Sequence, residues 1–288
     1  MNLALSSGSF TNIFDLWFFS LQYSFWYLVL IMLAFSLVSY KARQLTVSGS
    51  IVAFFVGFGI TYFLGFGAFT TMLLFFLFAG VLSKFSKMHS KFDAEEIQEK
   101  GSRRDGMQVF ANGGMALVAS VLYGLSPSIV ALVMFGASVA EAASDTFAGE
   151  IGILSKAKPI SIITGRKMRP GLSGAVSALG SITGLLGSLF VAIYWMSNFF
   201  PIEAKSFAYA SVVAISGFFG CLMDSVLGAT VQAHYYDQKR DCLTEHPTSG
   251  GEKLPLERGI RWIDNDLVNL MSNVIATLLG GALVLVIG

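Results

Sequence analysis

Long apolar stretches make up most of this chain, and short polar segments separate them. About eight stretches approach the roughly 20 residues that a helix needs to cross a bilayer. They lie at 22–40, 45–64, 66–83, 107–125, 127–144, 172–197, 206–233 and 267–287. With 54% hydrophobic residues, 13% charged residues and a mean hydropathy of +0.67, the chain has too little polar surface for a soluble globule. We expect an all-α fold, a polytopic helical bundle that forms a single transmembrane domain over residues 1–288.

Basic residues fall on one side of the predicted spans. The segments at 41–43, 84–104, 156–169 and 239–261 carry every Lys and Arg except Lys205. Because cytoplasmic loops of membrane proteins are enriched in Lys and Arg, we expect this side to face the cytoplasm and both termini to lie opposite. The expected location is the cell inner (plasma) membrane, as a multi-pass protein. The net charge of +1 gives no indication of nucleic-acid binding.

Several shorter features also carry expectations. Residues 10–19 are rich in Phe and predict an interfacial segment. Residues 84–100 form either a surface-lying helix or a solvated connector. Residues 248–251 form either a lid over a nucleotide or a flexible link. Small residues at helical spacing, as in Gly180, Gly184 and Ser188, predict close helix packing. The three His and two Cys show no metal-ligand or disulfide pattern.

Acidic and amide side chains recur at membrane depth near the basic side. Glu141 and Asp145 are four residues apart and share one helix face. A carboxylate there costs about 2.5–3.5 kcal/mol on insertion scales and usually lines a site, although it can instead pair two helices. Polar stripes also occur on three other predicted spans, at Gln108 and Asn112, at Asp224 and Gln232, and at Asp264, Asn265, Asp266 and Asn269. We expect the four stripes to meet in the cytoplasmic leaflet.

The residue types in these stripes favour Mg²⁺ and a polyphosphate. Carboxylates and carboxamides without a matching His or Cys set are hard oxygen ligands that suit Mg²⁺. The candidate metal ligands are Glu141, Asp145, Glu150 and Asp224. Cations lie close by in the sequence, at Arg103, Arg104, Lys156, Arg166, Lys167 and Arg169. A Gly-containing loop with Thr164, Gly165, Gly171, Ser173 and Gly174 leads into the next span, whose N-terminal amides could hold a phosphate.

Five sequence blocks together resemble one family. They are GSRRDGMQVFANGG (101–114), SDTFAGEIGILSK (144–156), ITGRKMRPGLSGAVS (163–177), GCLMDSVLGATVQ (220–232) and WIDNDLVN (262–269). In this order they resemble the integral membrane family of phytyl-phosphate kinases, long listed as domain of unknown function 92, which includes transmembrane protein 19. Residues 101–269 would form the motif-bearing catalytic region. Residues 1–85, the variable N-terminal helices, match only in hydrophobic character. The family is distantly similar to polyprenol kinases and CDP-diacylglycerol synthases, where Gly-Lys stands in place of Ser155 and Lys156.

The resemblance implies Mg²⁺-dependent transfer of a phosphoryl group from a nucleoside triphosphate, CTP or another, to a prenyl monophosphate such as phytyl or geranylgeranyl phosphate. The acceptor is already an oxyanion, so positioning and charge neutralisation can carry most of the catalysis. As hypotheses, Asp145, Glu150 and Asp224 hold the metal, Lys156, Arg166 and Lys167 bind the triphosphate, and Arg103 and Arg104 clamp the prenyl phosphate. The remaining polar residues, Gln108, Asn112, Gln232, Asp264, Asn265, Asp266 and Asn269, would orient these groups.

Two other functions remain open. Intramembrane acids and Gly-rich helices also mark lipid-phosphate or ion-coupled transporters, although here the polar stripes concentrate in one leaflet. A nucleotidyltransferase that forms a CDP-linked lipid would use the same kind of site. The position of the labelled phosphate in the nucleotide distinguishes the kinase from the nucleotidyltransferase, and vectorial flux without chemistry would identify a transporter.

Overall fold

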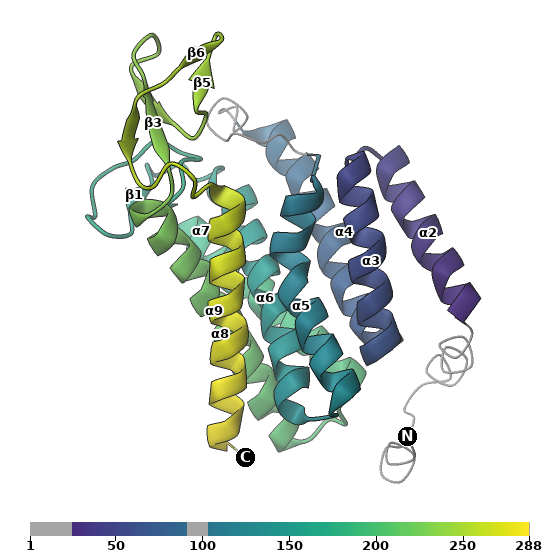
Figure 1. The fold of residues 1–288 in the computed structure, drawn as a ribbon. Helices are drawn as coiled ribbons and strands as arrows, with labels where there is room; N and C mark the ends of the chain where they lie inside the picture. The colour runs from purple at the N-terminus through teal and green to yellow at the C-terminus, as the bar shows by residue number, and fades with distance from the viewer. Residues whose placement is uncertain (1–24, 91–102, 288) are drawn as a thin grey trace.

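A computed structural model describes residues 25–90 and 103–287, which form a bundle of long helices (Figure 1). The helices are α2 (Phe25–Lys41), α3 (Val47–Leu64), α4 (Phe66–His89), α5 (Gly106–Leu125), α6 (Ile129–Gly152), α7 (Ala178–Phe199), α8 (Ala204–Thr230) and α9 (Asn265–Ile287). Within the described part, seven of them are long and apolar enough to cross a membrane, and α2 is a shorter apolar helix. The predicted polytopic all-α bundle is therefore confirmed, with seven long spans where about eight were expected.

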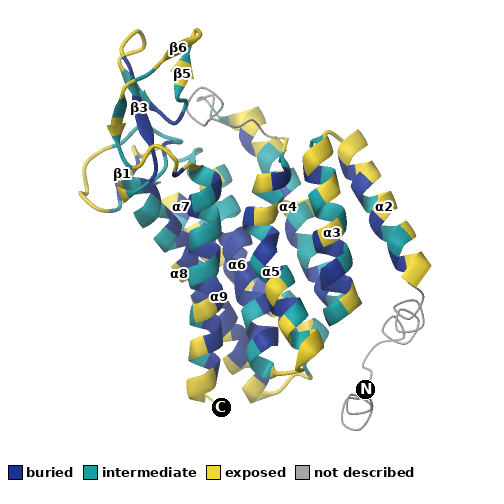
Figure 2. Ribbon diagram, viewed as in Figure 1, coloured by how far each residue is buried: buried dark blue, intermediate teal, exposed yellow. Residues whose placement is uncertain are grey.

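Helix α6 forms the centre of the bundle, and its neighbours pack closely on it (Figure 2). Glycines on α7 and α8 make this possible: a Cβ added at Gly187 would lie 2.9 Å from the ring of Phe147, and one at Gly217 would lie 2.7 Å from the Cβ of Ala140. Small residues let helix backbones approach in lipid. The prediction of tight packing is correct for these helices. Large apolar side chains such as Trp26 and Ile193 are exposed on the outer helices, as expected of a lipid-facing surface.

Two connections between helices project from the same end of the bundle (Figure 1). We call them, residues 153–177 and 231–264, the loop lobe. The first contains β1 (Ile160–Ser161) paired with β2 (Ala175–Val176). The second contains β3 (His234–Asp237), β4 (Cys242–Thr244), β5 (Thr248–Ser249), β6 (Glu252–Lys253) and β7 (Leu256–Arg258). The strands form an antiparallel sheet of order β4-β3-β7 and a β5-β6 hairpin.

Several predicted boundaries are wrong for local reasons. Ser177 caps α7 by accepting a hydrogen bond from the Gly180 amide, so residues 172–177 belong to the loop lobe rather than to a span. Helix α8 ends at Thr230, which places Gln232 outside it. Helix α4 continues to His89, so residues 84–89 extend that helix instead of forming a separate element. Residues 248–251 lie in the β5-β6 hairpin. The expectations for residues 10–19 and 91–100 lie outside the described residues.

The chain alternates direction through the bundle, so every described cation except Lys205 lies at or near the end that carries the loop lobe (Figure 1). Lys205 is in the first turn of α8, at the opposite end. The start of α2 and the end of α9 also lie at that opposite end. This arrangement agrees with the charge asymmetry used above to orient the chain.

Candidate functional site

A cavity of about 820 Å³ lies at the loop-lobe end of the bundle, lined by α4, α5, α6, α7, α8 and α9 and by the loops above them. The structure brings eleven of the predicted site residues to its lining: Arg104, Gln108, Asn112, Asp145, Glu150, Gly171, Ser173, Gly174, Asp224, Asn265 and Asn269. They come from separate segments, and the cavity is therefore the place where the polar stripes meet.

Two carboxylates face the cavity from neighbouring helices. Asp145 on α6 and Asp224 on α8 lie close enough for their charges to interact. Asp224 accepts a hydrogen bond from the hydroxyl of Ser272 at 3.3 Å. With its amide nitrogen turned toward the acid, Asn269 donates to Asp224 Oδ2 at 2.9 Å. Helix α9 thus supports the carboxylate of α8, and Asp145 is left facing the open space.

Glu141 lies one helical turn deeper than Asp145 and is not part of the cavity lining. It is 1% exposed. One oxygen accepts from Ser272 Oγ at 2.8 Å and the other from Asn273 Nδ2 at 2.5 Å. Asn273 also accepts from Ser138 Oγ at 2.7 Å. The structure therefore gives Glu141 the alternative role considered above, a carboxyl group that joins α6 to α9.

Glu150, at the end of α6, faces the other side of the cavity. It lies beside Ser83 and Ser86 of α4 and close to the cations Arg104 and Lys87. The four predicted metal ligands are therefore divided in space: Asp145 and Asp224 form a pair, Glu141 lies behind them, and Glu150 is surrounded by hydroxyls and cations.

The two adjacent arginines before α5 point in different directions. The Arg104 guanidinium lies 5.8 Å from the ring centroids of both Phe75 and Phe76 and lines the cavity. Arg103 instead donates to the carbonyl of Leu45 at 2.9 Å and lies over the ring of Tyr40. Of the two arginines predicted to clamp the prenyl phosphate, only Arg104 therefore lines the cavity. Arg103 instead contacts α2 and the turn that follows it.

The loop at residues 171–174 forms a wall of the cavity next to α8. Gly174 has φ +83, and a Cβ there would lie 2.6 Å from Ala229 Cα, so both the backbone conformation and the close approach require glycine. Ser173 donates from its amide at 2.9 Å and from its hydroxyl at 2.6 Å to the same oxygen of Glu245. The Ser173 hydroxyl is also 3.3 Å from Asn265 Oδ1. Glu245 therefore holds this loop in place.

The base of the loop lobe contains a buried histidine, His234. The His234 ring is 3.0 Å from the carbonyl of Gln232 and 3.4 Å from a nitrogen of Arg258. Burial, followed by the positive charge of Arg258, lowers the pKa of His234 to about 4. Gln232 is 1% exposed and not part of the cavity lining. These residues connect β3 and β7 to the end of α8.

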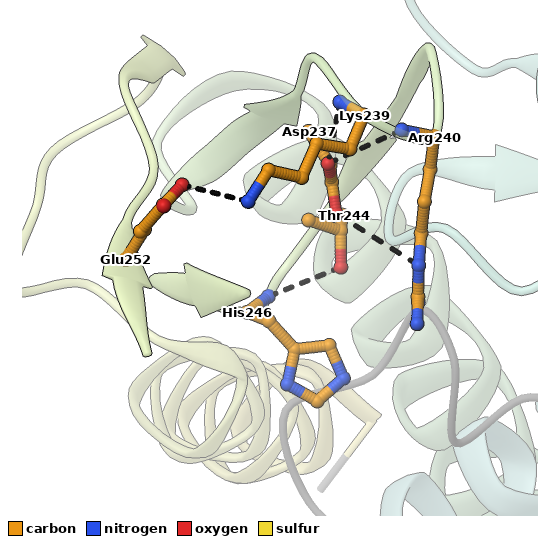
Figure 3. A network of polar contacts seen from close by, with 6 residues as sticks. All are labelled: Asp237, Lys239, Arg240, Thr244, His246 and Glu252. Atoms are coloured by element: carbon orange, nitrogen blue, oxygen red, sulfur yellow. Dashed lines mark hydrogen bonds and ion pairs between the residues drawn. The ribbon is translucent and has the colours of Figure 1, made fainter. Parts of the chain in front are cut away.

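The outer part of the lobe contains a network of polar contacts (Figure 3). Asp237 accepts from the amides of Lys239 at 2.9 Å and Arg240 at 3.2 Å, and a hydrogen bond from Ser249 holds the pKa of Asp237 below its usual value. Lys239 pairs with Glu252 at 2.9 Å. These contacts fix the turn between β3 and β4 and join it to the β5-β6 hairpin.

The remaining predicted residues lie away from the cavity lining. Ser161 accepts from the amides of Thr164 and Gly165 and donates its own amide to the Arg166 carbonyl, which closes a tight turn. Neither this turn nor Lys156 or Lys167 reaches the cavity lining. Asp264 accepts from the amide of Leu267 at 2.9 Å and so begins α9. Asp266 is 3% exposed and is also absent from the lining.

Mg²⁺ can be tested against the donor set. No group of three or more His, Cys, Asp or Glu residues within residues 25–90 and 103–287 is arranged to hold a metal ion. Mg²⁺ commonly binds through one or two carboxylates together with water and substrate phosphates. Asp145 and Asp224, supported by Asn269, fit that second mode. The residues present therefore suit a metal that arrives with a phosphate ligand.

Several cavity residues were not among the predicted site residues. They are Arg43, Gln44, Ser83, Lys84 and Lys87. Glu245 was also missed, although it contacts Ser173 directly. The signal available for Lys84 and Lys87 is their spacing of three residues near the end of an apolar run. Glu245 has no such signal, because only the folding of the lobe brings it to the loop.

Comparisons with known proteins decide the family. The family model described as Integral membrane protein DUF92 matches residues 30–277. The chain belongs to this family. Protein PGR of Arabidopsis thaliana is 28% identical over 262 residues, which cover 84% of this chain and 89% of that protein. An uncharacterized membrane protein of Methanocaldococcus jannaschii is 30% identical over 203 residues, 70% of this chain and 80% of that one. No solved structure matches the chain. The family inferred from the five sequence blocks is thus confirmed.

Proposed function

We propose that this DUF92 protein is a Mg²⁺-dependent prenyl-phosphate kinase, which transfers the terminal phosphoryl group of a nucleoside triphosphate, with CTP as first candidate, to a prenyl monophosphate such as phytyl or geranylgeranyl phosphate. The observation that carries the proposal is the cavity itself. It combines two interacting carboxylates, Asp145 and Asp224, with the cation Arg104 and with a glycine-containing loop. This combination suits a phosphate anion accompanied by a divalent ion.

The chemistry requires little beyond positioning and charge neutralisation. An oxygen of the prenyl phosphate attacks the terminal phosphorus, the bond from that phosphorus to its bridging oxygen breaks, and the nucleoside diphosphate leaves with the bonding electrons. Mg²⁺ would neutralise charge on the nucleotide phosphates, and Asp145 and Asp224 are the residues that would hold it. Gly171, Ser173 and Gly174 line the same space. Because the acceptor is already ionised, no histidine base is needed.

The proposed orientation places the cavity on the cytoplasmic side of the cell inner (plasma) membrane. The loop lobe and nearly all described cations lie at that end, and Lys and Arg accumulate in cytoplasmic loops. A nucleotide would then enter from the cytoplasm, and the isoprenoid chain would remain among the helices and lipids.

The position of a labelled phosphate tests the proposal. Purified protein in liposomes is given geranylgeranyl phosphate, Mg²⁺ and CTP labelled at either the α or the γ phosphate. A kinase transfers label to the lipid from the γ position alone, whereas a nucleotidyltransferase transfers it from the α position. Movement of the prenyl phosphate across the bilayer without any labelled product would instead identify a transporter.

A further inference from the structure

One side of the cavity is rich in cations, which come from the turn after α2, the end of α4 and the segment before α5. Of the described residues that line this side, Arg43, Lys84, Lys87 and Arg104 are basic and Glu150 is acidic. We call these four basic residues the cationic side. The carboxylates Asp145 and Asp224 line the same cavity from α6 and α8. The cavity therefore has one side suited to a metal ion and another suited to an anion.

The backbone around Arg104 is held firmly by the turn between α2 and α3. The amide of Arg104 donates to the carbonyl of Gln44 at 3.0 Å, and the amide of Thr46 donates to the carbonyl of Arg104 at 3.0 Å. A Cβ at Gly49 would lie 2.3 Å from that same carbonyl, so α3 approaches as closely as a glycine allows. The segment before α5 therefore depends on α2 and α3 for its position.

Helix α4 is fitted to the same turn. A Cβ at Gly80 would lie 2.9 Å from the amide nitrogen of the Gln44 side chain. Phe75 and Phe76, one turn earlier, lie beside the Arg104 guanidinium. The last turns of α4 then place Lys84 and Lys87 along the cavity. Three segments that are distant in sequence thus converge on one group of cations.

Apolar side chains continue the cavity lining next to these cations. Phe76 and Ala79 of α4 belong to it, and Phe76 lies beside the Arg104 guanidinium. An amphiphile with an anionic head and a hydrocarbon tail would contact both the cations and this apolar surface. The combination of a cationic head site and an adjoining apolar surface favours a lipid phosphate as the ligand of this side.

We infer that the cationic side binds the phosphate monoester head of the acceptor lipid, with Arg104 as its main contact, Lys84 as a second one, and the tail lying against Phe76 and Ala79 of α4. The inference rests on the proposed function in taking this lipid to be the phosphoryl acceptor. It gives α4, which lies outside the motif blocks, a part in the binding site through Lys84, beside Arg104 from the first block. It also leaves the opposite side, with Asp145 and Asp224, to the nucleotide.

A binding experiment tests the inference without relying on turnover. Full-length protein in phosphatidylcholine nanodiscs is titrated with radiolabelled geranyl phosphate and, separately, with labelled CTP in the presence of Mg²⁺. We expect Arg104→Gln and Lys84→Gln each to weaken geranyl phosphate binding, by about tenfold for Arg104→Gln and less for the exposed Lys84, because charge-assisted contacts to phosphate are lost. CTP binding should change by less than about twofold.

Two controls accompany this experiment. Lys158→Gln removes an exposed cation at the same end of the protein that is not part of the cavity lining, and it should leave geranyl phosphate binding unchanged. Arg104 also packs on two aromatic rings, so its substitution can affect folding. If Arg104→Gln fails to fold, Lys84→Gln still tests the inference. Inorganic phosphate is used as a competitor, and it should displace geranyl phosphate only at much higher concentration than the unlabelled lipid does.

The outcomes separate the inference from the proposed function. The inference is overturned if the variants weaken CTP binding instead, if neither ligand is affected, or if inorganic phosphate competes as well as the lipid. Turnover is scored in parallel with γ-labelled CTP. Suppose that the wild-type protein shows no turnover, but that Arg104→Gln and Lys84→Gln still weaken its binding of geranyl phosphate. This result would reject the kinase and retain the lipid-phosphate site.

Discussion

The two sides of the cavity are built in different ways. On the acidic side, Asp145 and Asp224 project from helices packed through small residues, and Asp224 is 8% exposed with hydrogen bonds from α9. On the cationic side, Arg43, Lys84 and Lys87 are exposed, and only Arg104 is held by a closely fitted backbone. A short carboxylate needs a rigid, crowded frame to remain at membrane depth, whereas a long cation can reach the same cavity from the surface.

This difference predicts how each side responds to substitution. Changes on the acidic side should affect either chemistry or folding strongly, because the carboxylates have short side chains and fixed neighbours. Changes on the cationic side should mainly weaken binding of an anion. The substitutions below test this difference, in order of decreasing effect.

Asp145→Asn should have the largest effect, a loss of turnover of about 10²–10³-fold or more, because it removes charge from the side proposed to hold the metal-bound phosphate. Turnover is measured with γ-labelled CTP in liposomes at matched protein amounts. Glu257→Gln, which removes an exposed carboxylate in the loop lobe, is the control. Wild-type turnover by Asp145→Asn at normal expression would remove this residue from the site.

Glu141→Gln should act mainly on stability. The new amide would place a donor where Ser272 and Asn273 already donate, and an unmatched buried group costs about 1–3 kcal/mol. A lower midpoint of thermal aggregation, followed by fluorescence-detected size exclusion, is the expected result. Turnover should fall less than in Asp145→Asn. If Glu141→Gln keeps its thermal midpoint but loses turnover completely, then Glu141 belongs to the chemistry and the division of the acidic stripe is wrong.

Gly174→Ala tests the loop that closes the acidic side. The substitution strains a backbone at φ +83 and brings a methyl group against Ala229, and the positive φ alone costs about 1–2 kcal/mol. We expect the KM for CTP to rise about tenfold. Gly250→Ala provides a matched control, since Gly250 also has positive φ (+57) but no atom within 4 Å of its added Cβ. If both substitutions raise the KM for CTP equally, the contact between residue 174 and α8 does not affect CTP binding.

The smallest expected effect is a pH dependence in the loop lobe. Burial lowers the pKa of His234 to about 4, whereas an unfolded histidine titrates near about 6.5. Between these two pKa values, His234 binds a proton in the unfolded lobe but not in the folded one. The free energy of unfolding of the lobe should therefore fall as the pH falls from about 6.5 toward 4, and His234 should not change it above about pH 6.5. Limited proteolysis in nanodiscs should therefore be faster at pH 5 than at pH 7.5. The increase in proteolysis rate at pH 5 should be smaller in His234→Gln. An equally large increase in this variant would show that another group causes the pH dependence.

The sequence predicts the membrane architecture well because apolar length is a local property. The span expected at 45–64 is observed as α3 at Val47–Leu64, and the polar stripes reach the cavity because helical spacing fixes which face they occupy. The loop lobe could not be predicted in the same way. Its strands have two to four residues each, and contacts with other segments determine them. The same holds for Glu245, whose partner Ser173 is 72 residues away in the chain.

The two arginines show a further limit. Arg103 and Arg104 are adjacent and chemically identical, so no spacing rule separates the one that faces the cavity from the one that binds Leu45. Their directions follow from the backbone contacts of the preceding turn. Arg166 and Lys167 show the same limit, because their place beside the glycine motif predicts a phosphate site, whereas in the structure they lie in a tight turn outside the cavity lining.

The order in which the helices are synthesised gives α9 a special position. Asn269, Ser272 and Asn273, which bond to Asp224 and Glu141, all lie on α9, which follows α6 and α8 in the chain. During biosynthesis, α6 and α8 leave the ribosome before the groups that bond to their acids exist. Insertion of α9 therefore supplies the hydrogen bonds to both acids and the α9 part of the cavity lining. A chain that terminates early would expose unpaired carboxylates within the bilayer, a signal that membrane quality-control proteases could recognise.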